Sequence, residues 1–325
     1  MKELLHKGFG LAVDQLLCGS LALLHRRHRG RVSSHALAET YFAACERLTR
    51  EAYFAAGAIE DLRLENAETI SWRSPGGLDG FFPRNERARV ILFQTRAEAP
   101  TVIMLHALMS ASAAGYRRWA RRFNDLGWNA AFVHLPFHYS RRPPGHLNGE
   151  LCCTADLILT GDTLRQAVIE IRQLLFWLRA QGGREFGLLG TSYGGWVAAL
   201  VASLEPGLRF VALLAPLVNI GYCLYEGPTS WSIRRQLARA GLDRSMIERH
   251  SHLSSPTYAK PAGAVAERTL IIGGLFDRIV RLSDLQGLHE SWPGSDFITL
   301  PQAHFGYSMI PRAVAWLRER RLLEE

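Results

Sequence analysis

The fold is decided by residues 187–196, which read GLLGTSYGGW. A short apolar run leads into a Gly-x-Ser-x-Gly turn, and an alanine-rich apolar stretch follows, a pattern typical of a buried strand, a sharp turn and a buried helix. Such a turn needs residues with almost no side chain two positions before and after the serine, and Gly190 and Gly194 meet that need. The turn nominates Ser192 as a nucleophile and the N–H of Tyr193 as a donor to an oxyanion.

On both sides of this turn, apolar runs of strand length alternate with longer amphipathic stretches. The expected parallel strands cover residues 101–105, 130–135, 186–189, 210–214, 269–273 and 297–300, and helices are expected at 116–126, at 162–180 and from 311 onward. Two earlier strands, at residues 69–72 and 90–95, are expected to form an antiparallel pair. The alternation predicts an α/β fold with a mostly parallel central sheet and helices on both faces. Such sheets bind substrates beyond the carboxyl ends of their strands.

The chain is expected to divide into two parts. Residues 1–60 are predicted to form an N-terminal helical extension, with one helix in residues 1–24 and a second in 34–57. Residues 61–325 are predicted to form the main domain. Within it, residues 216–267 break the alternation with aromatic and mixed polar content, and we interpret them as a small cap inserted over the active site.

A serine hydroxyl is a poor nucleophile at neutral pH, so Ser192 needs a neighbouring imidazole and the imidazole needs a carboxylate. Asp277 and His304 each follow the end of an expected strand by four residues. Because parallel strands end at one edge of a sheet, we expect both side chains to reach Ser192. The simpler alternatives are that Asp277 caps its loop and that His304 is a solvated loop residue.

A second oxyanion donor is expected from the loop that follows the strand at residues 101–105. The backbone N–H groups of Ala107 and Leu108 are the candidates. His106 is assigned to the substrate-binding residues, although a histidine that shapes this loop by hydrogen bonding is the simpler interpretation.

Residues 135–149 follow a strand and should border the pocket. We expect His138, Arg141 and Arg142 to contact the substrate, since a pair of guanidinium groups suits a carboxylate or a phosphate; the alternative is a structural role. His134 and His138 are four residues apart, but they do not share a helix face and a third ligand is missing from the pattern, so no metal is expected. No cofactor is expected either.

Composition limits the classes of function. The chain has 325 residues, 48% of them hydrophobic, which suffices for one large domain. Its formal net charge is +8, but the basic residues are scattered in pairs without a nucleic-acid-binding motif, so no nucleic-acid partner is expected. The five cysteines lack disulfide or metal spacing, which favours a reducing compartment and a cytoplasmic location.

The N-terminal stretch needs its own interpretation. Residues 9–24 begin like a signal peptide, but Asp14 and Gln15 interrupt the apolar run and no small-residue cleavage site follows. The run is also too short and too broken to span a bilayer. An amphipathic helix followed by a basic cluster at residues 26–31 leaves three interpretations, which are packing on the main domain, peripheral membrane contact through residues 1–31 and a secretory signal.

These motifs resemble those of the α/β-hydrolase superfamily, from about residue 69 to the C-terminus, and in particular an uncharacterised bacterial branch of esterase-like serine hydrolases. The segments that carry the resemblance are GTSYG at residues 190–194 and the loops around Asp277 and His304. The resemblance implies an α/β-hydrolase fold in which Ser192, Asp277 and His304 cleave a carboxylic ester or thioester through an acyl-enzyme. A small-molecule ester or thioester is then the expected partner.

One position departs from the pattern of many relatives, which have His-Gly where this chain has His106-Ala107. Alanine keeps the N–H donor and loses the conformational freedom of glycine. The sequence leaves other functions open, because the same triad can transfer an acyl group to another acceptor or cut a peptide. A weakly catalytic, membrane-associated binding module is the alternative from a different class.

Overall fold

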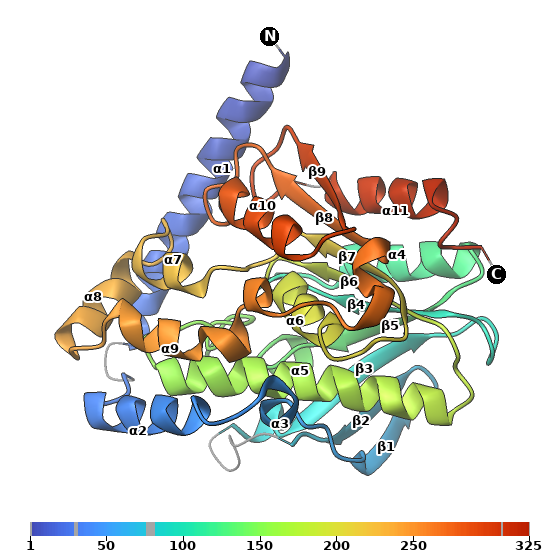
Figure 1. Ribbon diagram of the computed structural model, residues 1–325, viewed down its shortest axis with the longest axis horizontal. Coiled ribbons are helices and arrows are strands. Elements are labelled where there is room, and N and C mark those ends of the chain that lie inside the picture. Colours follow the sequence, from blue (N-terminus) through green and yellow to red (C-terminus); the bar gives the residue numbers. More distant parts are fainter. Residues whose placement is uncertain (1, 29–31, 76–81, 307, 325) are drawn as a thin grey trace.

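Nine strands form one central sheet in the computed structural model, which describes residues 2–28, 32–75, 82–306 and 308–324 (Figure 1). The order across the sheet is β1-β2-β3-β5-β4-β6-β7-β8-β9. The strands are β1 (Glu60–Asn66), β2 (Thr69–Arg73), β3 (Arg87–Phe93), β4 (Thr101–Leu105), β5 (Asn129–His134), β6 (Phe186–Thr191), β7 (Leu208–Leu214), β8 (Thr269–Gly274) and β9 (Asp296–Leu300). The pairs among β1, β2, β3 and β5 are antiparallel, and every pair from β5 to β9 is parallel.

Helices cover both faces of this sheet because the strands bury side chains on both faces. In β4, Ile103 and Leu105 pack into one core cluster and Val102 and Met104 into the other. The first cluster includes side chains of α5 (Leu157–Ala180), α6 (Tyr193–Ala202) and α10 (Leu282–Ser291), and the second includes those of α4 (Ala114–Asp125) and α11 (Met309–Glu319). The predicted mostly parallel α/β architecture is confirmed.

The second predicted N-terminal helix is divided in two. The helix expected at residues 34–57 is replaced by α2 (His35–Cys45) and α3 (Arg50–Tyr53). Thr49 begins the second of these, because its side chain accepts a hydrogen bond from the N–H of Ala52 at 3.2 Å. Strand β1 was not predicted, since all seven of its residues are exposed and its apolar alternation is limited to Leu62 and Leu64.

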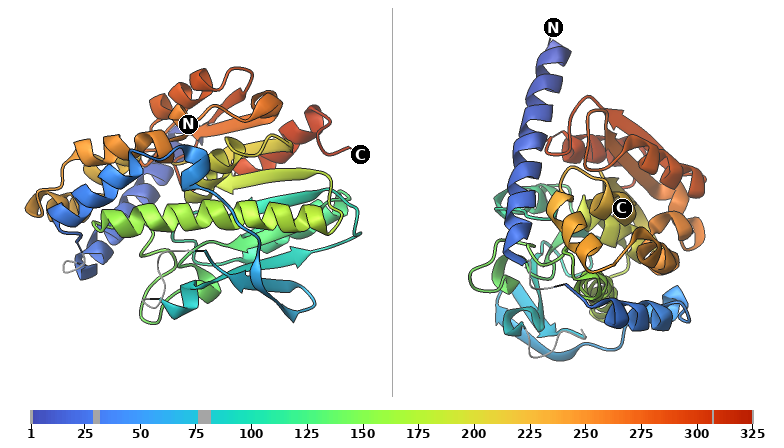
Figure 2. Two further views of the ribbon diagram at one scale, coloured as in Figure 1. Left: turned by 60° about the horizontal axis from the view of Figure 1, so that its bottom comes forward. Right: turned by 90° about the vertical axis from the view of Figure 1, so that its left-hand side faces the viewer.

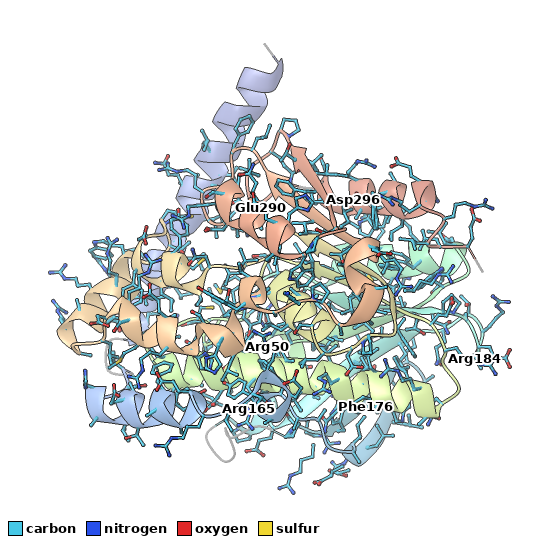
Figure 3. The ribbon with its side chains drawn as sticks, viewed as in Figure 1. Arg50, Arg165, Phe176, Arg184, Glu290 and Asp296 are labelled. Carbon is cyan, nitrogen blue, oxygen red and sulfur yellow. The ribbon has the colours of Figure 1, made fainter. Side chains whose placement is uncertain are left out.

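Residues 216–267 carry three α-helices, α7 (Ile220–Tyr225), α8 (Trp231–Arg239) and α9 (Arg244–Ser254). The N-terminal helices pack against this segment, α1 (Lys2–Leu24) on α8 and both α2 and α3 on α9. Arg50 of α3 donates to the carbonyl of His252, and Arg165 of α5 donates to that of Tyr53 at 2.7 Å, which ties these helices together (Figure 3). The division of the chain at residue 60 stays a prediction.

Helix α1 projects at its N-terminal end beyond the rest of the molecule (Figure 2). Across residues 2–28, 32–75, 82–306 and 308–324, no helix is both long and apolar enough to cross a bilayer. Residues 29–31 of the basic cluster lie outside the described residues.

Candidate active site

The turn after β6 holds Ser192 in a strained backbone conformation. Its backbone φ is 51° and its ψ is −113°, a combination that L-residues rarely adopt. A Cβ atom at Gly190 would lie 2.4 Å from the carbonyl oxygen of Gly194, and one at Gly194 would lie 2.4 Å from that of Leu105. Both positions therefore require glycine. The Ser192 N–H donates to the carbonyl of Leu214 at 2.8 Å, which fixes the turn to the end of β7.

The three residues expected to form a triad converge at the carboxyl ends of β6, β8 and β9. Ser192 Oγ lies 2.9 Å from His304 Nε2, and His304 Nδ1 lies 2.7 Å from Asp277 Oδ2. The other carboxylate oxygen, Asp277 Oδ1, accepts hydrogen bonds from the N–H groups of Ile279 at 2.8 Å and Val280 at 2.9 Å. These two bonds orient the carboxylate toward the imidazole, so the arrangement can pass a proton from the hydroxyl to the ring.

The triad is almost completely shielded from solvent. The side chain of His304 is 6% exposed and that of Asp277 is 1% exposed. Burial lowers the pKa of the His304 imidazole, but the charge of Asp277, the hydrogen bond to it and the charge of Asp14 outweigh that effect and raise the pKa. The imidazolium that forms when His304 accepts a proton is therefore stabilised.

Two backbone N–H groups remain candidates for holding an oxyanion. Tyr193 is the first residue of α6, where an N–H has no partner within the helix. Among the described residues, none accepts a hydrogen bond from the N–H of Leu108. The expectation for Ala107 is corrected, because its N–H donates to the Tyr116 hydroxyl at 3.0 Å. Leu108 is left as the second candidate donor from this loop.

His106 shapes the oxyanion loop from inside the protein. Its Nε2 accepts the Leu135 N–H at 3.1 Å, so its Nδ1 carries the proton and donates to the carbonyl of Ala107 at 3.0 Å. Burial lowers the pKa of His106 to about 4, which keeps the ring neutral. The His106 side chain is fully buried, so the expected contact with a substrate is corrected to the simpler interpretation, a histidine that shapes the loop by hydrogen bonding.

His138 is also fully buried and makes no contact with solvent. Its Nδ1 lies 2.8 Å from the carbonyl oxygen of Pro136, and its ring centroid is 4.4 Å from that of His106 and 6.5 Å from that of Tyr193. It therefore packs inside the protein beside Tyr193, which corrects the expected substrate contact. The Arg142 side chain is exposed, and its contact with a substrate stays a prediction.

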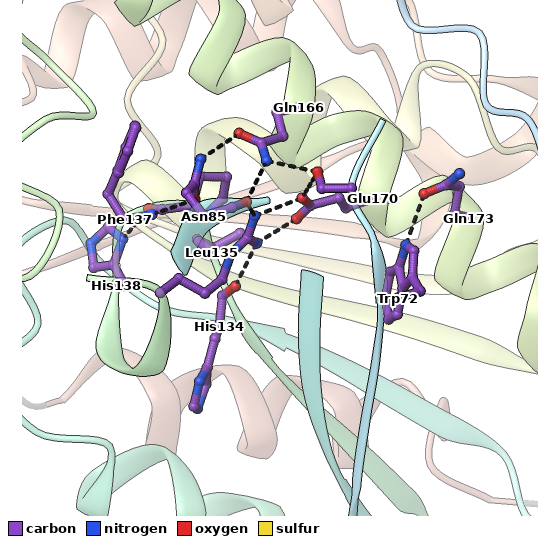
Figure 4. Close-up of polar contacts among 12 residues, drawn as sticks. Trp72, Asn85, His134, Leu135, Phe137, His138, Gln166, Glu170 and Gln173 are labelled. Carbon is purple, nitrogen blue, oxygen red and sulfur yellow. Dashed lines mark hydrogen bonds and ion pairs between the residues drawn. The ribbon is translucent and has the colours of Figure 1, made fainter. Parts of the chain in front are cut away.

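Arg141 forms a buried ion pair with Glu170, each side chain being 1% exposed (Figure 4). Its two terminal nitrogens donate to the two Glu170 oxygens at 2.6 and 2.7 Å, and also to the carbonyls of His134 at 3.0 Å and Asn85 at 2.9 Å. The Asn85 side chain in turn accepts the N–H of Phe137 at 3.0 Å. The guanidinium has no exposed surface for a substrate, so the role expected for Arg141 is corrected to a structural one.

One residue beside the triad was not anticipated from the sequence. Asp14 of α1 accepts a hydrogen bond from the backbone N–H of His304 at 3.2 Å. The signal was present, since Leu11, Asp14, Cys18 and Leu21 recur at helical spacing; Asp14 and Cys18 are buried, and Leu11 and Leu21 are half-buried. An acidic residue on an inward helix face indicates a polar partner in the body of the protein.

In the part of the chain that the structure describes, no group of three or more His, Cys, Asp or Glu side chains is arranged to hold a metal ion. All five cysteines are free thiols.

Comparison with known proteins gives matches in sequence and in fold. A family model described as alpha/beta hydrolase domain containing 18 matches residues 119–243. An uncharacterised protein of Mycobacterium tuberculosis, Rv2627c, is 29% identical over 234 residues, which are 70% of this chain and 54% of that protein. The chain thus spans about half the length of the curated relatives it matches.

Two solved structures resemble the whole chain more closely in shape than in sequence. Acetyl xylan esterase 1 from a Thermoanaerobacterium species has a TM-score of 0.57 at 15% identity and covers 92% of this chain and 98% of its own. An acetyl xylan esterase from a Paenibacillus species has a TM-score of 0.56 at 12% identity and covers 89% of this chain and 96% of its own. At such identities the likeness is one of fold.

Proposed function

We propose that this chain is a serine hydrolase of the α/β-hydrolase superfamily that cleaves a carboxylic ester or thioester through an acyl-enzyme. The match of residues 119–243 to an α/β-hydrolase family model and the likeness in fold to two acetyl xylan esterases support this proposal. The observation that carries the proposal is the continuous hydrogen-bonded chain from Ser192 through His304 to Asp277, with links of 2.9 and 2.7 Å. Activated nucleophiles depend on a base within this reach that a third group orients.

The first half of the reaction forms the acyl-enzyme. Ser192 Oγ attacks the carbonyl carbon while His304 Nε2 takes the hydroxyl proton, and Asp277 stabilises the resulting imidazolium. The N–H groups of Tyr193 and Leu108 hold the oxyanion of the tetrahedral intermediate. The intermediate collapses when His304 gives its proton to the leaving alcohol or thiol, which breaks the scissile bond.

The second half releases the acid. His304, now neutral again, takes a proton from a water molecule that attacks the acyl carbonyl. The same donors hold the second oxyanion, and His304 returns the proton to Ser192 Oγ as the acyl group leaves. The triad is then in its starting state, so one water is consumed per ester cleaved.

The pH dependence of ester hydrolysis tests this role for His304. The base must be neutral, and its surroundings raise its pKa above the value of a free imidazole. We therefore expect kcat/KM for a short p-nitrophenyl ester to fall as the pH drops through that raised pKa, with an acidic limb above about pH 6.5. Rates measured between about pH 5 and pH 8 check this. A rate that does not depend on pH in this window would argue against His304 as the base.

A second candidate function is peripheral contact with an anionic membrane through α1. Leu16, Leu17 and Leu23 are 72%, 40% and 59% exposed on this helix, and Arg26 and Arg27 just beyond it are exposed as well. Exposed leucines next to basic residues suit the boundary between acyl chains and anionic headgroups. Membrane contact would place the catalytic domain at a lipid surface.

Co-sedimentation with phosphatidylserine-containing vesicles tests this candidate. Burial of a leucine side chain in lipid contributes up to about 1.5–3 kcal/mol, so replacing Leu16 and Leu23 together with glutamine is expected to weaken binding by at least about ten-fold. Leu64→Gln is the matched control, because Leu64 is 76% exposed on β1, far from α1 in the chain. Equal binding of all three proteins, or none by the unmodified chain, would contradict a membrane role for α1.

A further inference from the structure

The carboxylate of Asp14 lies against the loop that carries His304, although the two residues are 290 positions apart. The backbone N–H of His304 donates to Asp14 Oδ2 at 3.2 Å, and Asp14 is 1% exposed. Its other oxygen, Oδ1, is buried without a hydrogen-bond partner among the described residues. Burying a carboxylate that is only half satisfied is costly, and packing alone does not explain an acidic residue at this position.

Asp14 also supplies a second acidic group next to the His304 imidazole, in addition to Asp277. Burial raises the pKa of the Asp14 carboxyl, the hydrogen bond from His304 opposes this, and the charge of Asp277 adds to it. When Asp14 is ionised, its charge acts together with that of Asp277 to favour the protonated imidazole. The same side chain therefore influences both the position and the protonation of His304.

Few other titratable groups take part in this arrangement. Asp14 interacts electrostatically with His304 and Asp277, which follow β9 and β8, and with Cys18 on its own helix. Burial raises the pKa of the Cys18 thiol to about 11, so this group stays neutral near pH 7. Arg278 partly offsets that rise. A change in charge at Asp14 should thus alter mainly the protonation of His304 and Asp277.

We propose that Asp14 is a positioning residue for His304, with its carboxylate fixing the backbone of the His304 loop and placing a second negative charge beside the imidazole. This inference rests on the proposed function of Ser192, His304 and Asp277. Helix α1 then contributes one positioning residue, since it brings Asp14 from the start of the chain to the general base. The site would be incomplete without this helix.

Two substitutions in the full-length protein separate the two roles of Asp14. Asp14→Asn keeps an oxygen that can accept the His304 N–H and removes the charge, whereas Asp14→Ala removes both. The matched control is Gln15→Ala, which removes an exposed polar side chain from the same helix. The rate of labelling by a fluorophosphonate probe and the hydrolysis of p-nitrophenyl acetate would be measured between about pH 5 and pH 8, where histidine titrates.

We expect the acidic limb of the pH profile of Asp14→Asn to shift to lower pH, because the His304 imidazolium is less stabilised without the charge of Asp14. The rate of this variant on the pH plateau should fall only a few-fold. Asp14→Ala should show the same shift and lose about ten-fold or more at the plateau, because the loop is no longer held. Gln15→Ala should match the unmodified protein. If Asp14→Ala fails to fold, the shift of the acidic limb in Asp14→Asn tests the proposal by itself.

Different results would overturn the proposed function and the inference about Asp14. If the unmodified protein neither reacts with the probe nor hydrolyses the ester, the proposed function is wrong and this inference falls with it. If the unmodified protein reacts and the Asp14 variants keep its acidic limb, the inference alone is overturned. A merely structural role for Asp14 would lower the plateau without moving the limb, which would also overturn it.

Discussion

Replacing Ser192 with alanine is expected to lower kcat for p-nitrophenyl acetate by about 10⁵- to 10⁶-fold, which is the scale of loss when a triad serine is removed. The variant keeps the oxyanion donors but has no atom that can form the acyl-enzyme. Initial rates at saturating ester, measured with enough protein to detect the residual activity, check this expectation.

The fold should survive this change. Alanine and serine carry the same Cβ atom, so the strained backbone at φ 51° is no harder for the variant to adopt. The matched control is Ser203→Ala, which removes a hydroxyl at the end of α6 that bonds only locally, to the carbonyl of Leu200 at 2.7 Å. Ser203→Ala should turn over the ester normally. Comparable activity in the two variants would remove Ser192 from the mechanism.

Replacing Glu170 with alanine is expected to lower the free energy of unfolding by about 3–5 kcal/mol. The substitution leaves the Arg141 guanidinium buried without its counterion, and it also removes the acceptor of the Ser74 hydroxyl. The loss should appear as a lower midpoint in urea denaturation with an unchanged slope. Ser74 just after β2, Asn85 just before β3 and His134 at the end of β5 all bond to this pair.

Two controls separate the cost of leaving the buried charge of Arg141 unpaired from the cost of losing an ion-pair contact. Glu185→Ala breaks an ion pair with Arg209 whose side chains are 43% and 25% exposed, and it should cost at most about 1 kcal/mol. The double change Arg141→Met with Glu170→Leu removes both charges and should cost less than Glu170→Ala alone. If Glu170→Ala were no more destabilising than Glu185→Ala, the structural role assigned to this ion pair would be wrong.

The sequence predicted what local patterns determine. The alternation of apolar runs gave the parallel strands and the order of the main helices, and the GTSYG turn placed Ser192 at a sheet edge. The offset of Asp277 and His304 from strand ends was enough to expect both side chains there. In each case the deciding feature lies within a few residues of the position that it fixes.

What the sequence did not predict depends on contacts between distant segments. Nothing around Arg141 indicates that Glu170, one helix later, is its partner, so an arginine in a loop suggested substrate binding. The Ala107 N–H seemed available because its acceptor, the Tyr116 hydroxyl, comes from the next helix. Asp14 looked like a break in an apolar run because its partner lies near the end of the chain. Only the tertiary structure supplies these pairings.

We propose that Ser192 Oγ is the nucleophile that forms the covalent intermediate. The most direct measurement is to treat the folded full-length protein with a fluorophosphonate, digest it and locate the added mass by mass spectrometry. We expect one modified peptide, with the adduct on Ser192, and no adduct when the protein is unfolded before treatment. An adduct on a different residue, or a folded protein that stays unmodified, would contradict it.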